Sequence, residues 1–296
     1  AMFTMMNAER LMVGIQGLGI AGAAYGQAAS YAKERLQGRS ADGSRNPVAI
    51  IEHADVRRML LTIRAFVEAG RALAGWTALQ LDRAHAHSDA AERAKADAFV
   101  ALLTPVVKAA FTDMGFESAV QAQQVFGGHG YIREWGMEQY VRDARIAQIY
   151  EGTNGVQAMD LVGRKLAMNG GRALQAFLKV VADEVAEAKG NEKLAPFAES
   201  LEKASAQLGA ATMWLMQNAM KNPNHAGAGA HHYMHILGIV ATGLMWLRMS
   251  KAAATVTRMP AKPIPMPVAM RADARYAGGG AGGSAGKGRP GGGRGL

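Results

Sequence analysis

A carboxylate on a glycine-containing turn is the feature of this sequence that most directly suggests catalysis. Glu151 lies in the run Tyr150-Glu151-Gly152-Thr153, between two segments of helical pattern. Held there and shielded from water, it could act as a general base, because desolvation makes a carboxylate a stronger base. A lone glutamate between two helices is more often a solvated or capping residue. The residue alone therefore indicates a candidate base and does not identify a reaction.

Two glycines at the end of a helical pattern are a second chemical feature. Gly127 and Gly128 follow a segment that remains helical in pattern to about Gln124. Unpaired backbone amides at a helix end can meet a phosphate or an adenine ring, and glycine lets such a group approach closely. Glycine after a helix is usually only a C-cap. This feature carries weight only in combination with its neighbours.

The run HHYMH raises the question of a metal site. His231 and His235 have the i, i+4 spacing that places two rings on one face of a helix. The chain has no cysteine, and no acidic residue lies close in sequence to complete a ligand set. We therefore interpret the histidines as a polar helix face and predict no metal site.

Helices must position all of these residues. Apolar residues recur at helical spacing in the first 257 residues, and no segment alternates convincingly with period two. Aromatic residues make up only 6% of the chain, whereas Ala, Gly and Met are abundant. Small residues and methionine suit close helix packing better than a β-sandwich. The predicted fold class is all-α, an up-and-down helical bundle with additional C-terminal helices.

Several local signals divide this bundle. The polar run 38–47 predicts a helix-to-helix loop, Ser88 a helix cap, and Pro105 a kink or junction. The uncharged stretch 11–32 is long enough to cross a membrane, but its Gly and Ala content favours a helix buried among other helices. Further helices are predicted at 138–149, from 155 to about 170, and at 172–189, 194–221 and 229–257, with Asn222-Pro223-Asn224 as the last turn.

The basic character of the chain is confined to its end. From Lys251 onward there are eight basic residues and one acidic residue, which is +7 of the net charge of +9. Beyond Met259 the composition is Pro-rich and then Gly-rich, which predicts disorder because little apolar surface can be buried. The predicted domains are a bundle at 1–170, an additional helical region at 171–257 and a disordered basic tail at 258–296. The nearly neutral body argues against nucleic-acid binding, and the absence of cysteine fits a cytoplasmic protein.

One block unites the glycines with the glutamate. It reads QVFGGHGY, then a spacer containing RDARI, then IYEGTNGVQ. In order, spacing and residue type it closely resembles the hallmark block of the acyl-CoA dehydrogenases. The upstream segments NAERLMVGIQGLGIAGAAY and YAKERLQGR are similar to the first helix of that family's carboxy-terminal domain. The resemblance covers residues 5–168, and the helical region to about 257 is similar to the subfamily that contains methylthiopropanoyl-CoA dehydrogenases.

The resemblance implies a role for Glu151 as the base in the α,β-dehydrogenation of an acyl-CoA thioester. Its carboxylate would remove the α-proton while the β-hydrogen leaves as a hydride to N5 of FAD. The backbone amide of Glu151 and a ribityl hydroxyl would stabilise the enolate oxygen. Substrate contacts are implied for Asn7, Arg10 and Gly152.

The resemblance also implies an FAD site shared between subunits. Arg35 corresponds to an arginine on the FAD pyrophosphate, whereas Gln124 and Gly128 correspond to residues that reach the adenosine half of FAD in a neighbouring subunit. This implies a homo-oligomer, a dimer or a tetramer, with an electron-transferring flavoprotein as the electron acceptor. The full set implied to bind FAD is Arg35, Gln37, Gln124, Gly127, Gly128, Thr153 and Asn154.

Glu9 is the alternative base. Some relatives, including isovaleryl-CoA dehydrogenase, carry their catalytic glutamate at this position on the first helix. This sequence has a glutamate at both positions. We favour Glu151 because it lies in the intact YEGT motif.

The resemblance does not extend to two domains of a complete family member, an amino-terminal helical domain and a middle β-barrel. The barrel supplies most contacts to the isoalloxazine ring, so we expect a truncated amino end and a chain that does not hold FAD productively alone. Two alternatives therefore stay open. One is a non-catalytic flavoprotein-like relative with the basic tail as a nucleic-acid arm, and the other is a helical assembly partner of a separately encoded amino-terminal half.

Overall fold

Long helices make up nearly all of the part of the chain that the computed structural model describes, residues 2–39, 43 and 46–256. The α-helices are α1 (Met2–Glu34), α2 (Ala54–Ala86), α3 (Ala90–Val125), α4 (Met137–Ala147), α5 (Asn154–Asp160), α6 (Arg172–Lys189), α7 (Ala195–Asn218) and α8 (Pro223–Val256). The short helical segments are η1 (Ile50–Glu52), η2 (Gly127–Tyr131), η3 (Arg133–Trp135), η4 (Leu161–Lys165) and η5 (Met168–Gly171). The all-α prediction is confirmed.

A small hairpin replaces the plain loop predicted at 38–47. Strands β1 (Leu36–Arg39) and β2 (Pro47–Ala49) pair antiparallel, with Leu36 opposite Ala49. Strands of four and three residues are too short to show an alternating pattern. The backbone N–H of Ile50 then donates to the carbonyl of Arg35 at 2.9 Å and fixes the hairpin to the end of α1.

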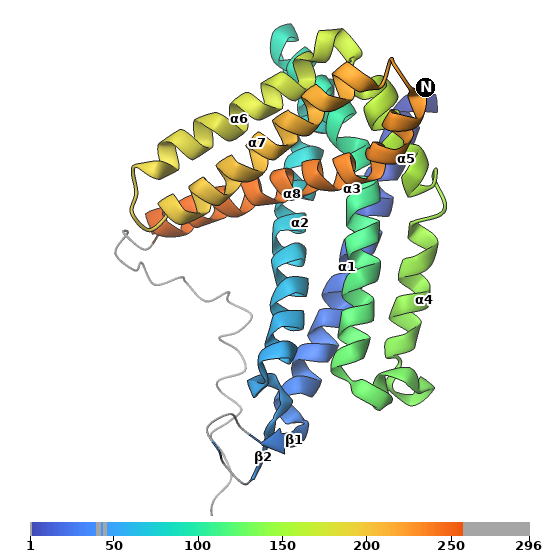
Figure 1. The fold of residues 1–296 in the computed structure, drawn as a ribbon, viewed down its shortest axis with the longest axis vertical. Coiled ribbons are helices and arrows are strands. Elements are labelled where there is room, and N and C mark those ends of the chain that lie inside the picture. The colour runs from blue at the N-terminus through green and yellow to red at the C-terminus, as the bar shows by residue number, and fades with distance from the viewer. Residues whose placement is uncertain (1, 40–42, 44–45, 257–296) are drawn as a thin grey trace, which may run out of the picture. The chain divides into compact units, whose positions relative to one another are not determined.

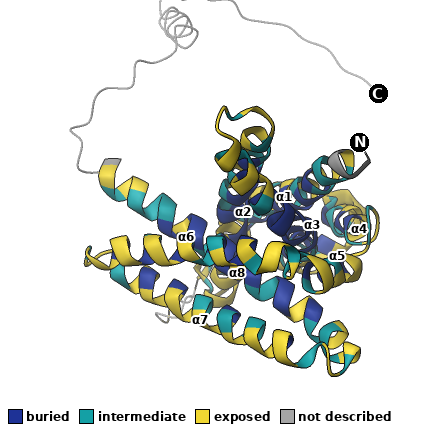
Figure 2. Cartoon of the chain, turned by 90° about the horizontal axis from the view of Figure 1, so that it is seen from above, coloured by how far each residue is buried: buried dark blue, intermediate teal, exposed yellow. Residues whose placement is uncertain are grey.

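Helix α3 is the centre of the bundle, surrounded by α1, α2, α4 and α5 (Figure 2). It continues through Pro105 as one helix, so the predicted junction there is wrong. Pro105 is buried, with neighbours on every side of the helix holding it in place. The predicted cap was also one residue off, because Asp89, not Ser88, accepts a hydrogen bond from the backbone N–H of Ala91 at 2.8 Å.

Glycines let α1 and α3 approach closely. A Cβ on Gly115 would lie 2.5 Å from the carbonyl oxygen of Gly17, and a Cβ on Gly17 would lie 2.9 Å from the carbonyl oxygen of Phe111. Such distances leave no room for a side chain. The Gly- and Ala-rich stretch 11–32 is therefore a packed helix, as predicted, with one face buried against α3.

Helices α6, α7 and α8 lie across one end of α1–α4 (Figure 1). Residues 1–254 form one compact unit. Helix α8 is attached by polar contacts, since Trp246 Nε1 donates to the carbonyl of Ala65 at 3.1 Å and Arg248 Nε donates to Glu184 at 2.9 Å. The bounds predicted for α6 match, whereas α8 begins at Pro223, inside the predicted last turn.

Two further features are the long apolar helices and the tail. By length and composition alone α3 and α8 could each cross a membrane. The apolar window of α3 is 83% buried within the protein, as in a core helix, whereas that of α8 is 39% buried. The predicted disordered tail at 258–296 lies outside the described residues.

Candidate active site

The turn that carries Glu151 has a conformation that most residues avoid. It connects α4 to α5, with φ of 57° at Glu151 and 84° at Gly152. Glu151 and Asn169 are the two non-glycine residues with positive φ among those the structure describes. Left-handed backbone at a non-glycine residue costs free energy and is concentrated at functional sites. The structure therefore singles out Glu151 independently of its sequence motif.

The side-chain amide of Gln157, on α5, fixes this turn. It is fully buried, and its Nε2 donates to the carbonyl oxygens of Glu151 at 3.2 Å and Gly152 at 3.4 Å. A Cβ on Gly152 would lie 2.6 Å from the same Nε2 atom. Glycine is therefore required at 152 both for the positive φ and for the space that Gln157 occupies.

Lys108, on α3, is the second anchor of the turn. Its side chain is fully buried, and Nζ donates to the carbonyl of Gly152 and to Oδ1 of Asn154, both at 2.8 Å. Burial lowers the pKa of Lys108 to about 8; Asp113 and Glu151 oppose this shift and Arg10 adds to it. Lys108 thus places a positive charge beside the turn. Lys108 could not be predicted as a site residue, because a single lysine in an apolar helical pattern gives no local signal.

The side chain of Asn154 points into the bundle. It is 7% exposed, and its Nδ2 lies 2.8 Å from Oγ1 of Thr112, 2.6 Å from Oδ1 of Asp113 and 3.2 Å from the carbonyl of Ala109. These three acceptors leave neither N–H of the Asn154 amide without a partner. The resemblance implied FAD contact for Asn154; in the structure its side chain fixes the start of α5 on α3, and contact with FAD stays a prediction.

Asp113 ties the two ends of the turn together. Its Oδ1 accepts hydrogen bonds from Nε2 of Gln148 and Nδ2 of Asn154, both at 2.6 Å. These residues flank Glu151 on either side, and the backbone N–H of Asn154 donates to the carbonyl of Gln148 at 3.1 Å. Burial raises the pKa of Asp113, but hydrogen bonds from His235, Gln148 and Asn154 outweigh it and hold the pKa below its usual value. The ionised carboxylate is thus the hub of the network.

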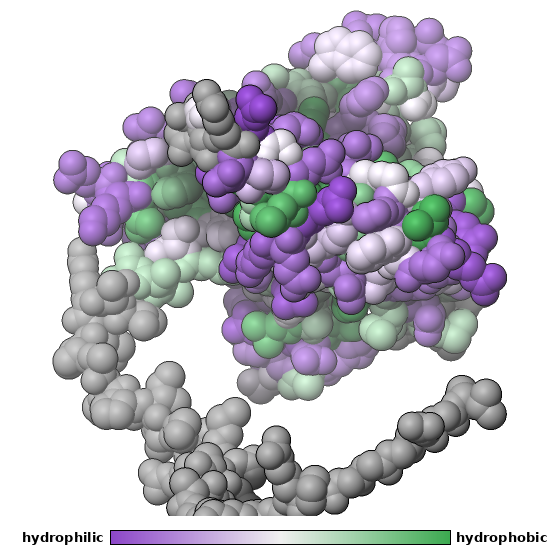
Figure 3. Space-filling view, turned by 90° about the horizontal axis from the view of Figure 1, so that it is seen from below, coloured by the Kyte–Doolittle hydropathy of each residue, from purple (hydrophilic) through white to green (hydrophobic). Residues whose placement is uncertain are grey.

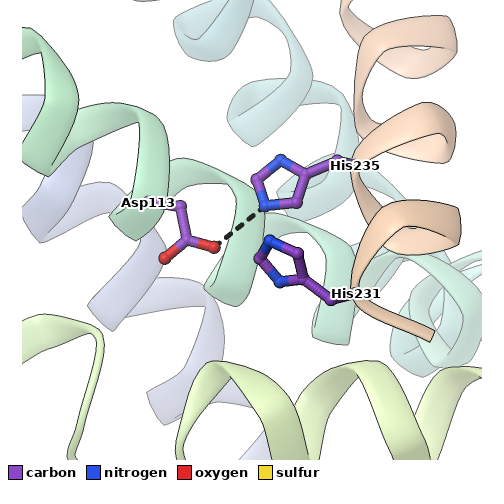
Figure 4. Close-up of side chains that lie close together, drawn as sticks. All are labelled: Asp113, His231 and His235. Carbon is purple, nitrogen blue, oxygen red and sulfur yellow. Dashed lines mark hydrogen bonds and ion pairs between the residues drawn. The ribbon is translucent and has the colours of Figure 1, made fainter. Parts of the chain in front are cut away.

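Helix α8 also contacts Asp113. His235 Nε2 donates to Oδ2 of Asp113 at 2.9 Å, and His231 lies beside it on the same helix (Figure 4). In the sequence the two histidines have no acidic neighbour, because Asp113 is 122 residues before His235. The acidic side chain comes from α3, so the reason for setting a metal site aside does not hold.

Of the three residues with predicted substrate contacts, Gly152 lies in the turn itself, and Asn7 and Arg10 lie on α1. Arg10 is close enough to Lys108 to affect its pKa, and Nε of Arg10 is buried without a hydrogen-bond partner among the described residues. Asn7 lies one helical turn earlier and is half-buried, whereas Glu9 is exposed. Tyr150 Oη donates to Oε1 of Gln16, which joins this part of α1 to the turn.

The predicted FAD contacts fall into two groups at different ends of the bundle. Thr153 is exposed beside Glu151 and caps α5, accepting from the backbone N–H of Val156 at 3.4 Å. Gln124 and the exposed glycines 127 and 128 lie at the far end of α3. Sixteen residues of helix separate Lys108 from Gln124, which corresponds to about 24 Å. A single chain does not bring the two groups together.

Arg35 and Gln37 lie at the hairpin end of the bundle, and both are exposed. The hairpin is held because Nε2 of His53 bonds the carbonyl of Gln37 at 2.8 Å. The face seen from this end is mainly hydrophilic, with scattered hydrophobic side chains (Figure 3). A phosphate could reach Arg35 here without displacing packed groups.

Aromatic stacking fixes the glycines at the end of α3. Tyr31 of α1 stacks on Phe126 with ring centroids 4.0 Å apart and is hydrogen-bonded to Nδ1 of His129 at 2.9 Å. Trp135 stacks on His129 at 4.8 Å. Gly127 has φ of 58°, and a Cβ there would meet no atom within 4 Å. Backbone conformation, and not crowding, therefore accounts for glycine at 127.

Comparison with known proteins decides the family. Residues 1–167 match the family described as "Acyl-CoA dehydrogenase, C-terminal domain", and residues 174–276 match that described as "Acetyl-CoA dehydrogenase C-terminal like". The chain belongs to the acyl-CoA dehydrogenase family. Family membership confirms the resemblance seen in the sequence, and the second match covers the additional helices α6–α8.

Curated relatives in this family are longer than the chain. It is 43% identical over 244 residues to the 3-methylmercaptopropionyl-CoA dehydrogenase of Ruegeria pomeroyi, covering 82% of this chain and 41% of the relative. It is 32% identical over 271 residues to the broad-specificity linear acyl-CoA dehydrogenase FadE5 of Mycobacterium tuberculosis, covering 88% and 44%. The chain therefore spans about two fifths of the length of these acyl-CoA dehydrogenases.

Solved structures share the fold. Caenorhabditis elegans ACDH-11 in complex with C11-CoA gives a TM-score of 0.72 at 20% identity, over 84% of this chain and 40% of that one. The acyl-CoA dehydrogenase of Bacillus anthracis complexed with FAD gives 0.64 at 22% identity, over 86% and 44%. Both likenesses cover more of the chain than α1–α5 alone, so the shared fold includes part of α6–α8.

Proposed function

We propose that this chain contributes the catalytic base, Glu151, to an FAD-dependent acyl-CoA dehydrogenase that oxidises the α,β bond of an acyl-CoA thioester. The observation that carries the proposal is the left-handed Glu151 turn, held by Lys108 from α3 and by Gln157 from α5. Two buried donors at consecutive carbonyls are more than a solvated loop requires. They are consistent with a carboxylate that must be positioned to within a fraction of an ångström.

The fixed turn also presents a backbone donor. The carbonyls of Glu151 and Gly152 are occupied by Gln157 and Lys108, whereas the amide N–H of Glu151 has no backbone acceptor among the described residues. Such an amide could donate to the carbonyl oxygen of a thioester as negative charge develops there. One residue would then remove the α-proton with its side chain and stabilise the resulting enolate with its backbone.

Cationic side chains near the turn, interspersed with the carboxylates of Asp113 and Asp160, could contact an anionic substrate. Arg10 and Lys108 lie near Glu151, and Lys165 is close enough to Arg10 for the two charges to interact. The buried Nε of Arg10 retains an unused donor. We propose that Asn7 and Arg10 contact the nucleotide portion of a CoA thioester. The Ruegeria relative is a 3-methylmercaptopropionyl-CoA dehydrogenase, which supports an acyl-CoA as the substrate class.

The FAD-binding donors would come from both ends of the bundle, with Thr153 beside Glu151 at one end and Arg35, Gln37, Gly127 and Gly128 together at the other. Exposed Arg35 and Gln37 suit a pyrophosphate, and the open backbone at Gly127 and Gly128 suits the adenosine half. Bound FAD would supply the hydride acceptor. Because the Gln124 end lies about 24 Å along α3 from Lys108, we propose that the two ends serve different FAD molecules in a homo-oligomer. An electron-transferring flavoprotein is the proposed electron acceptor.

A chimera tests the assignment of the base. This chain would replace the matching segment of the Ruegeria pomeroyi relative, and acyl-CoA-dependent reduction of a dye would be measured with FAD present. Removing a general base lowers the rate by about 10²- to 10⁴-fold, so Glu151→Gln should cause such a loss. The matched control Glu9→Gln should retain most of the activity. An inactive Glu9→Gln chimera together with an active Glu151→Gln chimera would transfer the base to α1.

A further inference from the structure

Helices α3 and α8 bring three metal-ligating side chains together outside the Glu151 turn. Nε2 of His235 lies 2.9 Å from Oδ2 of Asp113, and the rings of His231 and His235 have centroids 4.5 Å apart. One ligand atom from each of the three residues lies within 4.8 Å of the other two (Figure 4). No family comparison or sequence motif described above gives these three side chains a common role.

We propose that Asp113, His231 and His235 bind one divalent transition-metal ion, with Zn²⁺ as the expected occupant. Two imidazole nitrogens and one carboxylate oxygen are typical ligands for zinc, whereas Mg²⁺ and Ca²⁺ prefer oxygen ligands alone. Atoms 2.9 Å apart that each lie about 2.1 Å from a shared ion subtend an angle of about 90°. This angle fits a five- or six-coordinate ion with water in the open positions. His231 is exposed, so its ring can rotate to complete the ligand set.

The carboxylate is oriented as metal ligands usually are. Oδ1 of Asp113 is held by Gln148 and Asn154, which leaves Oδ2 directed towards the histidines. Hydrogen bonds of this kind fix the orientation of a ligand and tune its affinity for the metal.

The chemistry of binding balances without a net change in protons. In the absence of an ion the Nε2–H of His235 donates to Asp113. When an ion binds, this proton moves to Nδ1 of the same neutral ring, and Nε2 becomes a ligand. The hydrogen bond is replaced by metal bonds to both groups. The ion would then join α8 to α3 at the carboxylate that also holds Gln148 and Asn154.

Isothermal titration calorimetry of the 296-residue chain, first treated with a chelator to remove bound metal, tests the proposal by measuring the affinity and stoichiometry of metal binding. ZnCl₂ is the probe, MgCl₂ is the comparison, and CoCl₂ followed by visible absorption reports the ligand type. His231→Ala and His235→Ala should each weaken Zn²⁺ binding by more than about tenfold. His232→Ala is the matched control, because His232 is an exposed neighbour on the same helix but outside the cluster. Circular dichroism establishes that each variant is folded.

The outcomes separate the proposal from surface binding. One Zn²⁺ per chain, lost in His231→Ala and His235→Ala and retained within twofold in His232→Ala, would support it. Zn²⁺ binding that survives His231→Ala in a folded chain would overturn it and indicate histidines elsewhere, such as His85 and His87. Equal loss in all three variants, or no stoichiometric binding, would also overturn it. None of these measurements involves acyl-CoA, so the result is independent of the role of Glu151.

Discussion

Replacing Lys108 by methionine should change the way in which the stability of the chain depends on pH. Methionine has a similar length and no charge, so Lys108→Met removes one buried titrating group with little change in volume. In the folded chain burial lowers the pKa of Lys108 from 10.5 to about 8. Between these values the unfolded chain binds more protons than the folded chain, and stability rises with pH.

The size of the effect follows from that interval. From pH 8 to pH 9.5 the folded chain has released a proton that the unfolded chain still holds, which corresponds to roughly 2 kcal/mol of added stability. The Lys108→Met variant lacks this gain. The difference in unfolding free energy, wild type minus variant, should therefore grow by about 2 kcal/mol between pH 7 and pH 9.5. Other groups, including Tyr233 with its pKa raised to about 12 by burial, titrate equally in both chains.

Urea titrations at the two pH values, followed by circular dichroism, measure this difference. Lys179→Met is the matched control, because the side chain of Lys179 is 74% exposed and pairs with Asp183 on the surface of α6. The difference in unfolding free energy between wild type and Lys179→Met should be the same at pH 7 and pH 9.5 to within about 0.5 kcal/mol. If the difference in unfolding free energy between wild type and Lys108→Met is also the same at both pH values, burial does not lower the pKa of this lysine.

Two further stability predictions can be checked by urea unfolding at pH 7. Gly115→Ala should cost more than about 2 kcal/mol, since its Cβ would lie 2.5 Å from the carbonyl oxygen of Gly17. Gly19→Ala, where no atom lies within 4 Å, should instead stabilise α1 by up to about 1 kcal/mol; similar losses in both would contradict the close helix crossing. Asp89→Ala should cost about 1 kcal/mol and Ser88→Ala almost nothing; the opposite order would make Ser88 the cap.

Local sequence signals located most helices because their cause is local. The apolar spacing of 172–189 corresponds to the observed bounds of α6, since burial of one helix face requires that spacing. The errors arose where tertiary contacts prevailed. Pro105 does not break α3, because the helix is buried around it, and the hairpin after Leu36 is too short to carry a strand pattern.

The sequence by itself determined the helical fold class, the family block and the position of Glu151, because each is written in neighbouring residues. Only the tertiary structure placed Lys108 and Asp113 beside the turn and His235 on Asp113, over separations of 44 residues from Lys108 to Gly152 and 122 residues from Asp113 to His235. The left-handed turn at Glu151 also depends on tertiary contacts, since Lys108 of α3 donates to the carbonyl of Gly152 and Gln157 of α5 donates to the carbonyl of Glu151. Side chains that meet through helix packing leave no periodic trace in the chain, and this is why the polar network was invisible until the helices were assembled.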